Sequence, residues 1–97
     1  MIFEIKNLGR SINDIMRQIG YSPTYLQKEG KFSMVKMLAR IDYPRFHLYV
    51  NEIENGFSFD LHLDQKKPSY EGSKSHSGEY EGDVVEGEVG RIKDILA

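Results

Sequence analysis

The chain has 97 residues, of which 39% are hydrophobic and 11% aromatic, enough for one modest core and therefore for a single domain over residues 1–97. It contains no cysteine, which excludes disulfides and thiolate-bound zinc and fits a reducing compartment. The net charge is −2, so the chain as a whole is no polyanion binder. No apolar run reaches membrane-spanning length and no secretory signal opens the chain, so we expect a cytoplasmic protein with no membrane partner.

Charge is unevenly distributed along the chain. Residues 1–45 contain eight Lys/Arg and four Asp/Glu, whereas residues 46–97 contain five and eleven. Such asymmetry can mark an interaction surface. Charged side chains are mostly solvated surface, however, and we interpret the two halves as complementary faces that meet in the fold.

The first predicted element is a helix over about residues 12–19. Ser11 is a favourable N-cap with Asp14 three residues later, and Gly20 is a natural C-terminal cap. Between these caps the apolar residues have the spacing of one helix face: Ile12, Ile15, Met16 and Ile19.

Two strands are predicted next. Thr24-Tyr25-Leu26 has the composition of a short strand, and a turn follows at Glu29-Gly30. Residues 32–41 fit either a helix or a strand buried on both faces. We favour the strand, with Phe32, Met34 and Leu38 on one face and Val35, Met37 and Ile41 on the other, because turn residues bound it.

A β-hairpin is the clearest local prediction. Strands are expected over residues 45–54 and 57–65, joined by Asn55-Gly56 as a type I′ turn. This register pairs Leu48 with Leu63 and Val50 with Leu61. On the opposite face it pairs Asn51 with Asp60, Tyr49 with His62, and His47 with Asp64.

Residues 66–82 form a long polar connection, and a helix is predicted over about residues 83–96. A connection of this length in a small domain is usually functional or disordered, and its two Tyr and one His favour partial docking. The helix carries the apolar stripe Val85, Val89, Ile92 and Leu96. The predicted fold is therefore α+β in two layers: an antiparallel β-meander of about four strands, with an N-terminal and a C-terminal helix packed on the sheet.

Three strings in the C-terminal half resemble a group of short, uncharacterised bacterial proteins. They are Tyr43-Pro44-Arg45-Phe46-His47-Leu48-Tyr49, Leu61 to Tyr70 (LHLDQKKPSY) and His76-Ser77-Gly78-Glu79-Tyr80. The resemblance implies a bacterial protein and no particular activity.

The residues that could carry chemistry lie in the hairpin and the connection after it. His62 and Asp64 share a strand face, His47 is predicted opposite Asp64, and His76 is in the connection. Imidazoles and a carboxylate on one side of a sheet could bind Zn²⁺, Fe²⁺ or Mn²⁺. Alternatively, a His beside an Asp, with its pKa raised, could act in acid–base catalysis. The simplest interpretation is a cross-strand pair on a solvated face, worth about 0.2–1 kcal/mol.

We favour a small non-enzymatic binding or adaptor module that uses the polar face of the hairpin and the 66–82 connection. A protein or small-molecule ligand is expected, and no cofactor. The candidate ligand-binding residues are His47, Tyr49, His62, Asp64, Lys66, Lys67, Tyr70, His76 and Tyr80. The alternative is a small enzyme dependent on a divalent transition metal, with His47, His62, Asp64 and His76 as ligands. Nucleic acid is a less favoured partner, because the pI of 5.9 is acidic and nucleic-acid-binding surfaces are usually basic.

Overall fold

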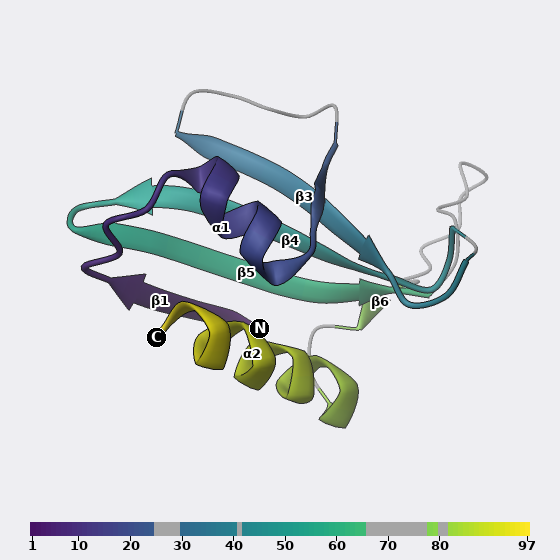
Figure 1. Cartoon of the computed structure of the whole chain (residues 1–97). Coiled ribbons are helices and arrows are strands. Elements are labelled where there is room, and N and C mark those ends of the chain that lie inside the picture. Colours follow the sequence, from purple (N-terminus) through teal and green to yellow (C-terminus); the bar gives the residue numbers. More distant parts are fainter. Residues whose placement is uncertain (25–29, 41, 66–77, 80–81) are drawn as a thin grey trace, which may run out of the picture.

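The computed structural model describes residues 1–24, 30–40, 42–65, 78–79 and 82–97, and they form an antiparallel sheet with two helices (Figure 1). The strands are β1 (Ile2–Lys6), β2 (Ser22–Pro23), β3 (Lys31–Met37), β4 (Arg45–Ile53), β5 (Gly56–Asp64) and β6 (Gly78–Glu79). The helices are α1 (Ile12–Ile19) and α2 (Asp83–Leu96). The sheet order is β1-β5-β4-β3-β2, and β6 also pairs with β5.

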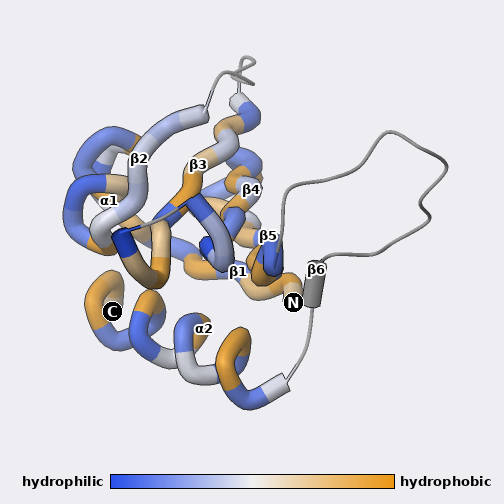
Figure 2. Tube along the Cα trace, turned by 90° about the vertical axis from the view of Figure 1, so that its right-hand side faces the viewer, coloured by the Kyte–Doolittle hydropathy of each residue, from blue (hydrophilic) through white to orange (hydrophobic). Residues whose placement is uncertain are grey.

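Both helices lie on the same side of the sheet (Figures 1 and 2). Alternate residues of the strands point toward them and form the core, together with Ile15 and Ile19 of α1 and the apolar stripe of α2. The buried strand residues are Phe3, Met34, Phe46, Leu48, Val50, Phe57, Phe59, Leu61 and Leu63. Each large apolar side chain buried in this way stabilises the fold by about 1.5–3 kcal/mol. The predicted two-layer α+β fold is confirmed, and the described residues form six strands where about four were expected.

Helix α1 begins and ends where its caps predict. Ser11 has an extended backbone, and its hydroxyl accepts a hydrogen bond from the Asp14 amide at 3.2 Å. Gly20 has φ +83°, and its amide donates to the carbonyls of Met16 and Arg17. Two residues of the apolar stripe, Ile15 and Ile19, are fully buried.

Helix α2 also matches its prediction. All four residues of its predicted stripe are buried, from Val85 at its start to Leu96 at its end. The helix passes beside β1, where Lys93 lies over the ring of Phe3 at 5.6 Å from the ring centre. Neither helix in the described part of the chain is long and apolar enough to cross a membrane.

The predicted hairpin is present, but its turn lies one residue earlier in the chain than predicted. The turn residues are Glu54 and Asn55, because Ile53 pairs with Gly56. Asn55 has φ +66°, whereas Glu54 is not among the described residues with positive φ, so the turn is not type I′. Leu48 therefore pairs with Leu61, and His47 with His62. A slip of two residues preserves the face on which every side chain lies.

The region before the hairpin is partly as predicted. The strand predicted over residues 32–41 is confirmed up to Met37, where β3 ends; residues 38–40 lie outside the strand and Ile41 lies outside the described part. Burial on both faces is wrong, since Met37 is 51% exposed. The short strand predicted at residues 24–26 lies earlier, at Ser22–Pro23, and residues 25–29 lie outside the described part. Strand β1 was not predicted. Its alternation, with Phe3 and Ile5 facing the core, was the available signal.

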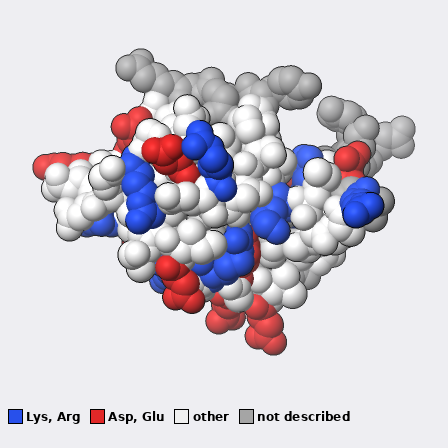
Figure 3. Space-filling view, viewed as in Figure 1, with Lys and Arg blue, Asp and Glu red and all other residues white. Residues whose placement is uncertain are grey.

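Two further expectations concern the surface and the long connection. On the helix-covered side of the molecule, basic and acidic side chains are interspersed rather than separated into two fields (Figure 3). Within the predicted 66–82 connection, Gly78 and Glu79 form β6, paired with Asp64 and Leu63. The remaining residues of the connection up to Glu81 lie outside the described part of the chain.

Candidate functional site

The polar side chains of the hairpin gather on the face of the sheet that neither helix covers, which we call the open face. Alternation places His47 and Tyr49 of β4 on this face, together with His62 and Asp64 of β5. Because His47 pairs with His62 across the two strands, the two imidazoles lie side by side. The neighbouring strand β3 adds Ser33 to the same face.

Asp64 lies at the centre of this group. One carboxylate oxygen, Oδ1, lies 2.9 Å from His62 Nε2, and the other, Oδ2, lies 3.3 Å from His47 Nδ1. Arg45 Nε lies further away, at 3.9 Å from Oδ2. The side chains of His62, His47 and Asp64 are only 8%, 13% and 16% exposed. The interpretation as an exposed pair on a solvated face therefore does not describe this cluster.

The aromatic rings of the cluster are stacked. The rings of His47 and Tyr49 have centres 4.3 Å apart, and those of Tyr49 and His62 have centres 5.6 Å apart. Tyr49 is 38% exposed, so part of its ring surface faces outward. The stack holds the imidazoles in place and leaves an aromatic surface beside them.

A hydrogen bond from β3 fixes the second nitrogen of His47. Ser33 Oγ lies 2.7 Å from His47 Nε2. A neutral His47 with its proton on Nδ1 satisfies both contacts, since Nδ1–H donates to Asp64 and Nε2 accepts from the Ser33 hydroxyl. This is the connectivity of a Ser-His-Asp triad. Ser33 is only 2% exposed, however, so a substrate does not reach its hydroxyl in this arrangement, and we assign it the role of orienting His47.

The pKa of His47 lies below its ordinary value of 6.5. Burial is the main cause, because it disfavours the charged ring, and the neighbouring His62 acts in the same direction. Asp64 acts in the opposite direction and is outweighed. Asp64 thus raises the pKa of His47 as expected, but burial outweighs this effect, so the net shift is downward and favours the neutral ring at neutral pH.

Four of the nine predicted ligand-binding residues are brought together: His47, Tyr49, His62 and Asp64. The other five lie outside the described residues: Lys66, Lys67, Tyr70, His76 and Tyr80. Ser33 and Arg45 join the cluster without having been predicted as part of it. The sequence signal for Ser33 is a small polar residue between Phe32 and Met34 in the strand.

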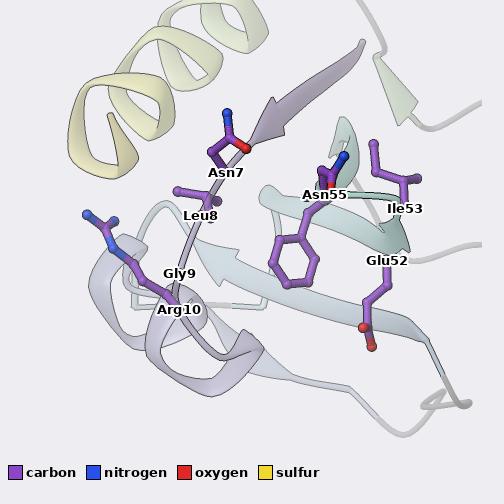
Figure 4. Close-up of a pocket in the computed structure, with 9 residues that line it drawn as sticks. Asn7, Leu8, Gly9, Arg10, Glu52, Ile53 and Asn55 are labelled. Carbon is purple, nitrogen blue, oxygen red and sulfur yellow. The ribbon is translucent and has the colours of Figure 1, made fainter.

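An open hollow of about 500 Å³ lies at the turn between β4 and β5, away from the His–Asp cluster. It is bordered by this turn and the segment that follows β1 (Figure 4). Arg10 and Glu52 lie at opposite sides of it. None of the clustered His and Asp residues lines this hollow. We therefore place the candidate site on the open face and not in the hollow.

Comparison of the chain with known protein families, with curated proteins and with solved structures finds no match.

Proposed function

We propose that this protein is a small non-enzymatic binding module, and that its ligand is held on the open face over His47, Tyr49, His62 and Asp64. The observation that carries the proposal is the bridging of two largely buried imidazoles by one largely buried carboxylate. These groups lie on the face opposite the hydrophobic core, so the core does not need them.

The energetics support a functional role for the cluster. Removing titratable groups from water costs free energy, and replacing a buried charged pair by apolar residues is often neutral or stabilising. If these positions contributed only to the stability of the sheet, Val or Thr would therefore stabilise it more. Titratable groups that are desolvated and in contact with one another are typical of binding and catalytic sites.

Tyr49 supports binding rather than a purely internal network. Its ring packs on His47 yet remains partly exposed, which offers a ligand an apolar surface next to polar atoms. Binding sites for small molecules commonly combine aromatic surface with a few fixed polar groups. Protein or small-molecule ligands therefore fit this face.

A binding screen that reports on each backbone amide tests the proposal. The ¹⁵N-labelled protein is titrated with a panel of small-molecule fragments, short peptides and divalent metal chlorides while its amide spectrum is recorded. We expect binders to shift the amides of Ser33, His47, Tyr49, His62 and Asp64. Binders that shift only amides around the hollow near Arg10 and Glu52, or a panel without binders, would contradict the proposal.

A matched pair of substitutions completes this test. Tyr49→Ala removes the exposed aromatic surface of the site and should weaken binding of a fragment or peptide from the panel at least about fivefold, since one well-packed aromatic contact contributes about 1 kcal/mol or more. Ile2→Ala removes an apolar side chain from the same open face on β1, where Ile2 is 71% exposed, and should leave binding unchanged.

A further inference from the structure

We propose that the ligand of this site is a divalent transition-metal ion, bound by His47, His62 and Asp64; this inference rests on the proposed function. One ligand atom from each of the three residues lies within 4.8 Å of the others. No described residue outside this trio belongs to a comparable group of His, Asp and Glu.

The spacing suits a single ion. A tetrahedral zinc ion lies about 2.0–2.2 Å from its nitrogen and oxygen ligands, which places those ligand atoms about 3.4 Å from one another. The contacts of Asp64 with His47 Nδ1 at 3.3 Å and with His62 Nε2 at 2.9 Å are close to that separation. Small rotations of the three side chains would therefore allow an ion between them.

The donor atoms select the class of metal. Two imidazole nitrogens and one carboxylate oxygen suit zinc, iron and manganese, whereas magnesium and calcium prefer oxygen ligands throughout. Three protein ligands leave a fourth position of a tetrahedral ion for water or a bound molecule.

Ser33 provides the outer support that such sites use. Metal-binding histidines generally donate the proton of their second ring nitrogen to a fixed acceptor, which sets the tautomer and the ring orientation. In the metal-bound form, His47 Nδ1 binds the ion, and Nε2–H donates to Ser33 Oγ, which lies at 2.7 Å. The same contact thus serves both the free and the metal-bound ring.

Arg45 opposes metal binding. Its guanidinium lies 3.9 Å from Asp64, and its positive charge would repel a divalent ion near that carboxylate. The side chain is 27% exposed, so it can turn toward water when the ion enters. Arg45→Gln should therefore tighten metal binding, which no purely structural role for the cluster would predict.

The main experiment is a calorimetric titration of the chelator-treated full chain with ZnCl₂, with MgCl₂ as the comparison. We expect one zinc ion per chain, a zinc-dependent rise in melting temperature, and no response to magnesium. Asp64→Asn should weaken zinc binding at least tenfold. The matched control is Asp60→Asn, on the same strand and face, whose side chain is 39% exposed; it should change affinity less than twofold.

If the variants unfold, the metal site can still be tested on the unsubstituted protein by NMR spectra of its imidazole nitrogens. Zinc should shift the ring nitrogen signals of His47 and His62 together. No zinc binding, equal effects of Asp64→Asn and Asp60→Asn, or ring signals of both histidines that do not move would each overturn the metal site. If another probe still shifts the amides of the open face, the metal inference fails while the binding function stands; if no probe does, both fail.

Discussion

At Gly56, the backbones of β1 and β5 approach too closely to leave room for a side chain. Gly56 begins β5, where it pairs with Lys6 of β1 and with Ile53 across the turn. A Cβ atom at this position would overlap with the carbonyl oxygen of Ile5 and lie only 2.7 Å from the Cα of Lys6. Both atoms belong to the backbone, so no side chain can turn away to make room.

We therefore expect Gly56→Ala to lower the free energy of unfolding by at least about 1 kcal/mol, within the range for overpacked sites. Replacing a strand glycine by alanine ordinarily stabilises a protein, so a loss of stability here would indicate a steric clash. Urea denaturation measures the effect. The control is Gly87→Ala in α2, where nothing lies within 4 Å of the added carbon and a gain of about 0.5–1 kcal/mol is expected. An unchanged midpoint for Gly56→Ala would contradict the close approach of β1 and β5.

Residue-level features of the site were predictable where they depend on alternation along one strand. His47 and Tyr49 were correctly placed on the same face as His62 and Asp64, because a slip of two residues does not change faces. The partner of each side chain was not predictable, because the turn uses Glu54 and Asn55 and shifts the register. Ser33 was missed because its contact with His47 depends on how β3 pairs with β4, which no local pattern specifies.

At the scale of elements, a buried polar network joins the two helices. The hydroxyl of Tyr21, which follows α1, donates to Glu88 of α2 at 2.6 Å. Arg91 donates to both carboxylate oxygens of Glu88 at 2.8 Å and to the carbonyl of Ile19 at 2.6 Å. The extents of the helices were predictable from the caps of α1 and the apolar stripes of both helices. This network was not, since its contacts between the two helices join residues 67 or more positions apart.

The network makes stability depend on pH. Burial works against ionisation of Glu88, but hydrogen bonds from Arg91 and Tyr21 and the charge of Arg91 outweigh it, so the pKa of Glu88 lies below its ordinary value of 4.5. A depressed folded-state pKa adds stability that is complete above the ordinary value and is lost as pH falls through the folded-state value.

Glu88→Gln should therefore destabilise the protein at pH 7 by about 1.5–3 kcal/mol, the range for hydrogen bonds to charged groups. The difference from the unsubstituted protein should shrink as the pH falls below 4.5. Urea midpoints at several pH values measure it. Glu86→Gln, on the exposed side of the same helix, should change stability by less than about 0.5 kcal/mol at any pH. A Glu88→Gln difference that stays constant down to pH 3 would contradict the role of the ionised carboxylate.

At the scale of the whole molecule, the two faces of the sheet have different roles. One face carries the core beneath α1 and α2, and the other carries the His–Asp cluster with no helix over it in the described part of the chain (Figure 2). The two-layer arrangement was predictable because each helix has an apolar stripe and each hairpin strand has an apolar face. These surfaces leave water when the helices pack on the sheet. Strand β1 brings a further apolar pair, Phe3 stacked on Phe59, into the same core.

This difference predicts that an Ile→Ala substitution costs much more stability on the core face than on the open face. Ile92 of α2 is fully buried, so Ile92→Ala should cost about 2–5 kcal/mol, since it removes core contacts and leaves a cavity. Ile2 of β1 lies on the open face and is 71% exposed, so Ile2→Ala should change stability by no more than about 0.5 kcal/mol. Urea denaturation of both variants measures the two values under identical conditions. Equal costs for the two variants would mean that a second apolar layer covers the open face, and the binding site proposed there would then be inaccessible.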